Sequence, residues 1–291
     1  MRLNLGRTLA WTALIVFLVL TILPFYWMIR TAITPAGDIF TDSTNLLPAH
    51  PTMINFWRVL GLVDDATARK AGGSGAHINF LRYTLNSTIY ALSIAAVQTF
   101  CCAMAGYAFA RLRFPGRDLV FGVLIAALMV PPIFTLLPNF TLVKNLGLID
   151  TFAGMVAPNL LMTPFAVFFL RQFFLSVPRE VEEAATIDGA GRWGIFWRVV
   201  MPMSRGPLLT IALTTAVWAW KDFLWPLLVG RGEPTRVLTV ALGVFRQQSP
   251  DTQPDWTGLM AASALSVVPV VLVLVFLGKR LVQSLNFTGI K

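Results

Sequence analysis

The chain has 291 residues, of which 56% are hydrophobic and only 13% are charged, and its mean hydropathy is +0.69. Soluble globular proteins carry about 25% charged residues, so this composition excludes an ordinary soluble protein and predicts an all-α integral membrane protein. The net charge of +9 could indicate a nucleic-acid partner. However, the basic residues occur singly or in pairs beside hydrophobic stretches, which indicates membrane topology signals and no nucleic-acid binding.

Six hydrophobic segments can each cross a bilayer as an α-helix, which needs about 20 apolar residues. They cover about residues 8–29, 83–110, 119–137, 151–174, 206–229 and 257–277. Arg2 and Arg7 precede the first segment as in a secretory signal, but the apolar run exceeds the roughly 7–15 residues of a signal's hydrophobic core. We therefore expect this segment to be retained, and residues 1–291 to form a single domain of six transmembrane helices.

Prolines interrupt two of these segments. Pro131 and Pro132 lie in the third and predict a kink near its outer end, because proline lacks the backbone N–H that a helix interior uses. Pro158 and Pro164 interrupt the fourth segment in the same way. Residues 139–150, between these two segments, are expected to form a short external turn.

The distribution of lysine and arginine predicts a cytoplasmic N-terminus. With that orientation, the short connection after the second segment is cytoplasmic, and it holds Arg111, Arg113 and Arg117. Basic residues accumulate on the cytoplasmic side of short membrane loops. We therefore expect both termini and residues 175–205 to face the cytoplasm, and residues 30–82 to form an external loop.

The longest clearly polar interval in the second half of the chain is residues 178–202. Ser176 is placed to cap a helix, and Pro178 suits its first turn. Glu180 and the acidic residues after it suit the positive end of a helix dipole. Gly189 can adopt a positive φ and end that helix. The pattern predicts a short acidic helix followed by a glycine turn.

A second helix is expected after the turn, so that the interval presents two different surfaces. The face of the first helix at i, i+3, i+4 and i+7 consists of Val181, Ala184, Ala185 and Asp188. The aromatic stripe of the second helix consists of Trp193, Phe196, Trp197 and Val200. Pro202 is expected to close the second helix. The small side chains of the first helix would let a partner approach closely, so the interval is a candidate docking loop.

The spacing of this interval resembles that of a known loop. Glu183-Ala184-Ala185, three residues, Gly189, nine residues and then Val199, Val200, Met201 and Pro202 resemble the EAA loop of ABC-importer permeases, E-A-A-x3-G-x9-I-x-L-P. The chain has Val199 where the pattern has Ile, and Met201 where it has Leu. The resemblance is strongest to sugar-importer permeases of the maltose type. It extends to residues 220–226, 255–262 and 288–291.

This resemblance implies the permease subunit of an ATP-driven importer for a sugar or polyol derivative, in the cytoplasmic (inner) membrane of a prokaryote. The implied partners are the lipid bilayer, a second homologous permease, a dimer of ABC ATPase subunits and an external solute-binding protein. The residues implied to couple the chain to the ATPase are Glu182, Glu183, Ala184, Ala185, Asp188, Gly189 and Pro202. In this scheme the chain is not an enzyme and binds no cofactor, and ATP with Mg²⁺ binds to the partner ATPase.

Other chemistries find little support. No G-x-x-x-x-G-K-[ST] motif is present, so the chain cannot bind ATP in the P-loop manner. Residues 189–194 read G-x-G-x-x-G, but a predicted helix, not a strand, precedes them, and no acidic residue follows about 20 positions later. His50 and His77 lack metal-ligand spacing, and Cys101 and Cys102 lie in an apolar segment, so no metal site is predicted.

One ionic pair lies inside a predicted span. Lys221 and Asp222 follow Trp218 and Trp220 in the fifth segment. A charge at membrane depth costs roughly 2.5–3.5 kcal/mol on insertion scales, so it usually faces a bundle interior or water. One hypothesis is a solute pathway, in which Asp222 accepts hydrogen bonds from sugar hydroxyls and the tryptophans stack on sugar rings. The other is an interfacial lysine within an aromatic belt.

Two other classes of function stay open. An ion-coupled secondary transporter would use Lys221 and Asp222 as its intramembrane charges, although no further relay group or inverted repeat is evident. A membrane enzyme would need convergent polar groups on the spans, and the sequence offers none.

Overall fold

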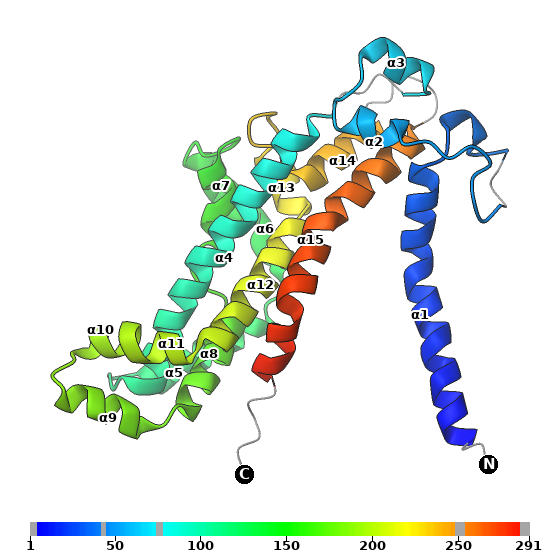
Figure 1. The fold of residues 1–291 in the computed structure, drawn as a ribbon. Helices are drawn as coiled ribbons and strands as arrows, with labels where there is room; N and C mark the ends of the chain where they lie inside the picture. Colours follow the sequence, from blue (N-terminus) through cyan, green and yellow to red (C-terminus); the bar gives the residue numbers. More distant parts are fainter. Residues whose placement is uncertain (1–4, 42–44, 74–77, 248–253, 286–291) are drawn as a thin grey trace. The chain divides into compact units, whose positions relative to one another are not determined.

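A computed structural model describes residues 5–41, 45–73, 78–247 and 254–285, and this part of the chain contains helices and no strands (Figure 1). His77 and the tail at 288–291 lie outside the described residues. The chain divides into two compact units, which are described separately. Unit 1 is residues 1–84 with 240–271, and unit 2 is residues 85–239 with 272–291. The three boundaries fall inside α4 (Phe80–Arg111), α14 (Leu238–Gln247) and α15 (Trp256–Leu285).

Unit 1 begins with a long apolar helix. α1 (Leu5–Ala32) exposes most of its large apolar side chains, from Leu9 to Ile29, and its mean hydropathy of 2.3 meets the requirement for a membrane span. A helix that is apolar all round and exposed suits a lipid environment. The short helices η1 (Ala36–Asp38), α2 (Ile54–Val59) and α3 (Asp65–Lys70) follow, and α14 (Leu238–Gln247) and the first part of α15 complete the unit.

A buried asparagine fastens the loop after α1 to the end of that helix. The side-chain amide of Asn55, the second residue of α2, donates hydrogen bonds to the backbone oxygens of Ala32 and Thr34, each at 2.8 Å. The last carbonyls of a helix have no partner within the helix, so a side chain that binds them stabilises its end. The start of α2 is therefore held against the end of α1.

A buried ion pair holds the same loop to the start of α15. Arg58 Nη1 lies 2.8 Å from Asp255 Oδ2, and Arg58 Nη2 donates to Thr257 Oγ1 at 2.9 Å. Asp255 Oδ1 also accepts from the backbone N–H of Gly258 at 2.8 Å, so it caps α15. Gly73 leaves room for this pair, because a Cβ there would lie 2.5 Å from Arg58 Nη1.

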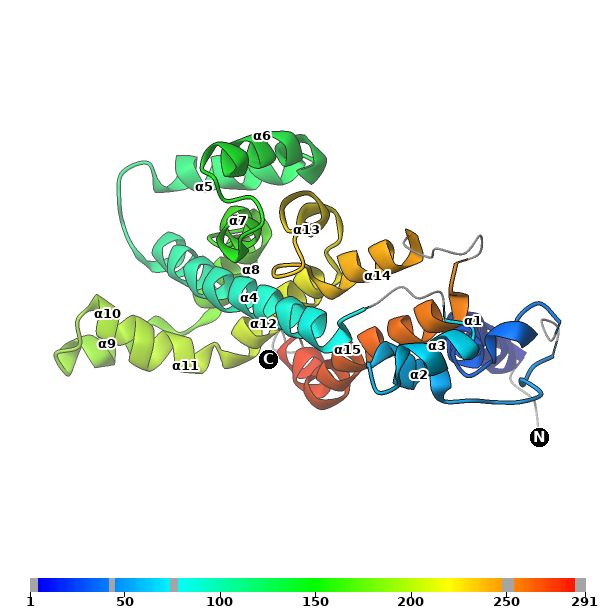
Figure 2. The ribbon, with the colours of Figure 1, turned by 90° about the horizontal axis from the view of Figure 1, so that it is seen from above.

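Unit 2 contains the remaining helices. In chain order after α4 they are α5 (Arg117–Ala126), η2 (Ala127–Met129), α6 (Pro132–Asn145), α7 (Phe152–Val156), η3 (Ala157–Asn159), α8 (Pro164–Ser176), α9 (Arg179–Ile187), α10 (Arg192–Ile195), the π-helical turn η4 (Phe196–Val200), α11 (Met201–Met203), α12 (Arg205–Lys221) and α13 (Leu224–Val229). Seen from above, α5 and α6 lie together at one edge of the unit, and α9 and α10 project beyond the end of α4 (Figure 2).

The prolines break helices where the sequence predicted interruptions. The axis bends by 101° between residues 117–129 and 132–145, and by 51° between residues 152–159 and 164–176. Pro132 and Pro164 each begin a new helix, because a first turn does not use the missing N–H. The helix that starts at Pro132 continues to Asn145, so half of the expected external turn is helical.

Three helices of the described chain are long and apolar enough to cross a membrane, and up to five spans result if each bent pair counts as one. They are residues 6–32, 80–111 and 256–278. The predicted fifth span, residues 206–229, is a helix of 17 residues, α12, separated from the short α13 by Asp222 and Phe223. Several apolar helices are therefore present, and the count of six stays a prediction.

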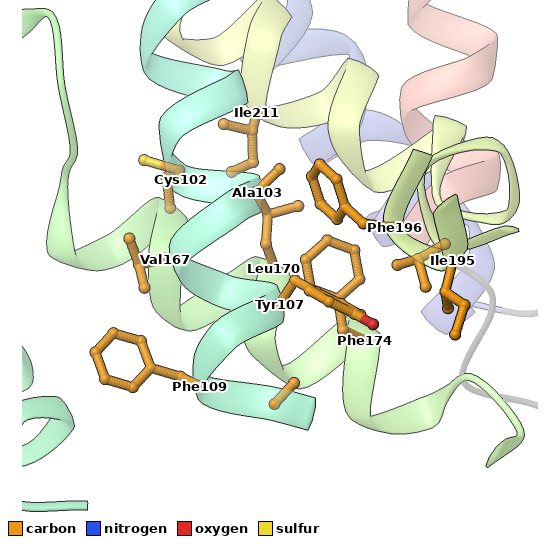
Figure 3. Close-up of a cluster of buried hydrophobic side chains, with 13 residues drawn as sticks. Cys102, Ala103, Tyr107, Phe109, Val167, Leu170, Phe174, Ile195, Phe196 and Ile211 are labelled. Atoms are coloured by element: carbon orange, nitrogen blue, oxygen red, sulfur yellow. The ribbon is translucent and has the colours of Figure 1, made fainter. Parts of the chain in front are cut away.

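An aromatic core in unit 2 joins α4, α8, η4 and α12. Figure 3 shows Tyr107, Leu170, Phe174 and Phe196 pointing toward one another. The ring centroid of Tyr107 lies 5.3 Å from that of Phe196 and 6.3 Å from that of Phe174, distances at which aromatic pairs stabilise beyond their buried area. Since Phe196 belongs to the polar interval at residues 178–202, this core anchors the interval to the membrane helices.

Glycine allows two helices of this core to meet closely. A Cβ on Gly106 of α4 would lie 3.1 Å from the backbone nitrogen of Arg171 and 3.2 Å from Leu170 Cβ, both on α8. Small residues at such crossings let membrane helices pack backbone to backbone. Nearby, the thiol of Cys102 is fully buried and accepts a hydrogen bond from the backbone N–H of Thr163 at 3.4 Å, which is a packing role.

Candidate functional site: the loop at residues 178–202

The first helix of the interval, α9, begins without a side-chain cap. Pro178 is its N-cap residue, with φ −59° and ψ 134°. The predicted cap by Ser176 is wrong, because α8 continues to Ser176, whose hydroxyl donates to the backbone oxygen of Phe173 at 2.7 Å. Pro178 therefore lies just before the first turn, where its fixed φ sets the direction in which α9 leaves α8.

The glycine turn after α9 is confirmed. Gly189 has φ +84°, and its N–H donates to the oxygen of Thr186 at 3.0 Å. The next N–H, of Ala190, donates to the oxygen of Ala185 at 2.9 Å. These two bonds form a Schellman motif, which ends a helix and fixes the direction of the chain after it. A Cβ on Gly189 would meet nothing within 4 Å, so backbone conformation alone favours glycine here.

The structure divides the residues of α9 into two faces. Glu182 and Ala185 are half-buried, and Ala185 packs against the aromatic core. The other residues of α9 are exposed, and the name outer face is used here for Glu180, Glu183, Ala184 and Ile187 of this helix together with its C-cap residue, Asp188. Ile187 is 87% exposed, and the sequence motif predicts no role for it. Ile187 therefore adds an exposed apolar side chain to the carboxylates of this face.

An arginine on α4 contacts the inner side of α9. Arg111, the last residue of α4, places Nε 2.8 Å from Glu182 Oε1, and its Nη2 donates a short hydrogen bond to the backbone oxygen of Val177. The side chains of Arg111 and Glu182 are only 7% and 15% exposed. From the sequence, Arg111 is expected only to be a topology signal in a basic connection. No local pattern links it to α9.

The second half of the interval is a helix with a π-helical turn. Phe196 and Val200 are buried, whereas Trp193 and Trp197 are exposed, so the predicted stripe is divided between the core and the surface. The N–H of Met201 donates to the oxygen of Phe196, a π-type bond. Pro202 does not close this helix: the chain continues through α11 into α12 with a break only at Ser204. Because Pro202 has no N–H, the preceding turn widens.

The ionic pair of the fifth segment lies at the break between α12 and α13. Lys221 is the last residue of α12 and is exposed, as is Trp218, while Trp220 is half-buried. Asp222 is half-buried, and Oδ2 accepts a hydrogen bond from the hydroxyl of Tyr90 on α4 at 2.8 Å. The backbone oxygen of Asp222 accepts from Thr239 Oγ1 at 2.6 Å. The two charges thus have different surroundings, one open and one held by neighbouring segments.

A tryptophan secures the other side of this break. The indole Nε1 of the buried Trp225 donates to the backbone oxygen of Met155 at 2.8 Å, which joins α13 to α7. Asp150, with φ 59°, accepts from the backbone N–H groups of Arg231 and Gly232 at 2.6 and 2.9 Å. The broken helix is therefore fixed at both ends by hydrogen bonds to other segments of unit 2.

Bent apolar helices, an interrupted span and an exposed acidic loop on an aromatic core define the transmembrane subunit of a transport system. The chain belongs to the family described as "Binding-protein-dependent transport system inner membrane component", whose model matches residues 103–287. This match confirms the resemblance to ABC-importer permeases. Subunits of this family are transport permeases of the inner membrane and not catalytic subunits, and such importers work with an ATPase and a substrate-binding protein.

Full-length relatives are similar over nearly the whole chain. A diacetylchitobiose uptake system permease protein of Streptomyces coelicolor is 32% identical, over 94% of this chain and 85% of that protein. An arabinooligosaccharides transport system permease protein of Bacillus subtilis is 28% identical, over 94% and 93%. An sn-glycerol-3-phosphate transport system permease protein of Agrobacterium fabrum is 29% identical, over 97% and 96%.

The fold has a solved counterpart. A chain in the crystal structure of a bacterial ABC transporter involved in the import of the acidic polysaccharide alginate superposes with a TM-score of 0.78. The two chains are 21% identical, and the match covers 95% of this chain and 96% of the other. This likeness concerns the fold. Together with the family match, it favours a permease of an ABC importer over an ion-coupled secondary transporter.

Proposed function

We propose that the chain forms, with a second homologous permease, the membrane pathway for a sugar or polyol derivative. The names of the relatives support this class of solute, because chitobiose derivatives, arabinose oligosaccharides and glycerol phosphate are all carbohydrates or polyol esters. A pair of ABC ATPase subunits binds ATP with Mg²⁺ and supplies the energy, and an external solute-binding protein delivers the solute. The chain itself binds no cofactor.

The proposed topology has six spans, with both termini and the loop at residues 175–205 in the cytoplasm. The helices at residues 6–32, 80–111 and 256–278 supply three spans, and the two bent pairs supply two more. The remaining span, which is the fifth in chain order, consists of α12, the break at Asp222 and α13. α12 alone is shorter than a full span. The predicted external loop, residues 30–82, is then a surface for the solute-binding protein, and its Arg58 is held by the ion pair with Asp255.

In the proposed mechanism, the outer face of α9 docks into a cleft of one ATPase subunit. Glu183 offers a charge-assisted contact to a basic group there, Ala184 permits close packing, and Ile187 adds an apolar contact. Closure of the ATPase pair moves α9 as a rigid body, and the membrane helices switch between inward-facing and outward-facing states. The observation that carries this proposal is the exposure of an acidic and apolar face on a helix whose other face is fixed to the core.

Trp218, Trp220, Lys221 and Asp222 are proposed to line the pathway. The exposed Trp218 and Lys221 are available to a solute, whereas the Asp222 carboxylate already accepts from Tyr90. We therefore propose that Trp218 and Lys221 contact the solute directly. Asp222 instead stabilises the break between α12 and α13. The belt hypothesis for Lys221 remains the alternative assignment.

A charge reversal on the outer face tests the docking proposal. Glu183→Lys places a positive charge against the proposed basic group, so we expect the purified permease pair to capture at least tenfold less ATPase, a change of about 1.4 kcal/mol. Glu233→Lys makes the same change at an exposed glutamate far along the chain, and its capture should equal that of the wild type. Equal capture by Glu183→Lys and the wild type would show that α9 does not dock there.

A further inference from the structure

We propose that Glu182 makes no contact with the ATPase and that its ion pair with Arg111 transmits the movement of α9 to the membrane helix α4. This inference rests on the proposed function, because it requires α9 to be the element that the ATPase moves. It reassigns one residue of the motif region and adds Arg111 as a positioning residue. Both residues belong to unit 2.

The first support is the direction of the two neighbouring glutamates. Glu183 is exposed, as docking requires, whereas the side chain of Glu182 is 15% exposed and lies 2.8 Å from Arg111. Successive residues of a helix point about 100° apart, so one glutamate can face a partner while the next faces its own chain. A carboxylate already covered by an arginine has little surface left for another protein.

The second support is the position of Arg111 at the junction of three elements. It is the last residue of α4, it pairs with Glu182 on α9, and it donates to the oxygen of Val177 between α8 and α9. Only Val177 and Pro178 separate these two helices. One guanidinium therefore holds both the moving helix and the short connection about which it would turn.

The third support is the low exposure of the pair. With 7% and 15% of the side chains exposed, water and salt screen the attraction far less than at an open surface. No hydrogen bond of standard geometry joins Nε to Oε1, so charge attraction is the main link between the two side chains. A displacement of α9 alone would separate two opposite charges and expose them. Because this separation costs free energy, α4 moves together with α9.

A second arginine secures the other side of the same helix end. Arg171 of α8 donates from Nε to the oxygen of Phe109 at 3.3 Å, and its guanidinium lies 4.2 Å from the ring centroid of Phe121 on α5. This arrangement ties the end of α4 to α8 and α5. A force applied to Arg111 therefore acts on a packed group of helices and not on a loose helix end.

Hydrogen–deuterium exchange on the assembled importer in nanodiscs tests the inference, with ATP and vanadate as the probe. In the wild type, the probe should change amide exchange both in α9 and in residues 104–111 of α4. In Glu182→Gln and Arg111→Gln we expect the change in α9 to persist. The change at residues 104–111 should fall roughly fivefold, within the range of coupling that single residues of a contiguous network provide. The double variant Arg111→Glu with Glu182→Arg restores the opposite charges but not the hydrogen bond to the oxygen of Val177, so it should recover part of this change.

Glu233→Gln is the matched control, because Glu233 is an exposed glutamate of unit 2 that lies outside the outer face. It should leave the exchange change at residues 104–111 as in the wild type. The inference is overturned if Glu182→Gln loses ATPase capture as Glu183→Lys does, or if it leaves the response of α4 unchanged. Failure of the proposed function looks different, because α9 would then not respond to ATP and vanadate in the wild type itself.

Discussion

At the scale of a residue, the structure changes the role assigned to the carboxylate of Asp222, which lies inside a predicted span. From the sequence, this carboxylate was a candidate partner for sugar hydroxyls. In the structure, it accepts a hydrogen bond from Tyr90, and its backbone oxygen accepts one from Thr239. A polar group removed from water is stable only when it is paired, so the pair itself explains how the charge is tolerated between α12 and α13.

A double-mutant cycle separates this pairing from direct solute contact. Asp222→Ala leaves the hydroxyl of Tyr90 without its acceptor, so it should destabilise the permease by about 1–3 kcal/mol, whereas Tyr90→Phe removes the hydroxyl altogether. We expect the double variant to lose less stability than the sum of the two single variants, as measured by thermal unfolding in detergent. If the losses of stability are additive and only Asp222→Ala abolishes uptake, the carboxylate contacts the solute and its bond to Tyr90 is not its main role.

At the scale of an element, α9 is defined by the turn that ends it. Gly189 adopts φ +84° with open space around its Cβ position, so a side chain there strains the backbone and touches nothing. The left-handed conformation costs a residue with a Cβ about 1–2 kcal/mol. Such strain would fray the Schellman turn and loosen the direction of the outer face.

Gly189→Ala is therefore expected to weaken ATPase capture roughly fivefold, which corresponds to about 1 kcal/mol of backbone strain. Gly189→Asn should lose less, because asparagine tolerates this conformation. Gly191→Ala is the control: Gly191 has φ −72° and likewise has open space at Cβ, so capture should not change. Surface-plasmon resonance with immobilised permease measures the three affinities. An equal loss at both glycines would point to the added methyl group and not to φ.

The elements that the sequence predicted correctly have local causes. The acidic helix, the turn at Gly189 and the breaks at Pro132 and Pro164 each follow from the conformational preferences of a few consecutive residues. The errors arise where packing decides. Ser176 continues α8 and therefore cannot cap α9, and Pro202 widens a turn without ending the helix.

The orientation of the residues in the candidate site could not be predicted from the sequence. Glu182 directly precedes Glu183, the first residue of the motif, and only the fold shows that one faces Arg111 while the other is exposed. Arg111 and Tyr90 lie far from their partners in the sequence, inside or at the end of an apolar segment. Contacts of this kind depend on which helices cross, which no local periodicity encodes.

At the scale of the whole molecule, the mechanism requires the outer face of α9 and the predicted external loop at residues 30–82 to lie on opposite sides of the membrane. Ile187 and Leu62 are suitable reporters, because they are 87% and 69% exposed. The native Cys101 and Cys102 lie within α4, and Cys102 is buried, so the parent chain labelled in parallel gives the background.

Ile187→Cys should react with a membrane-impermeant maleimide in inside-out vesicles and stay unlabelled in right-side-out cells, while Leu62→Cys should show the reverse pattern. The reason is the lysine and arginine bias, which places the short connection containing Arg111 inside. Added ATPase should then protect the thiol at position 187, because an 87% exposed side chain on the outer face becomes covered on docking. Labelling of position 187 from outside would place α9 beyond the reach of any ATPase. Labelling from inside without protection would show that a different surface makes the contact.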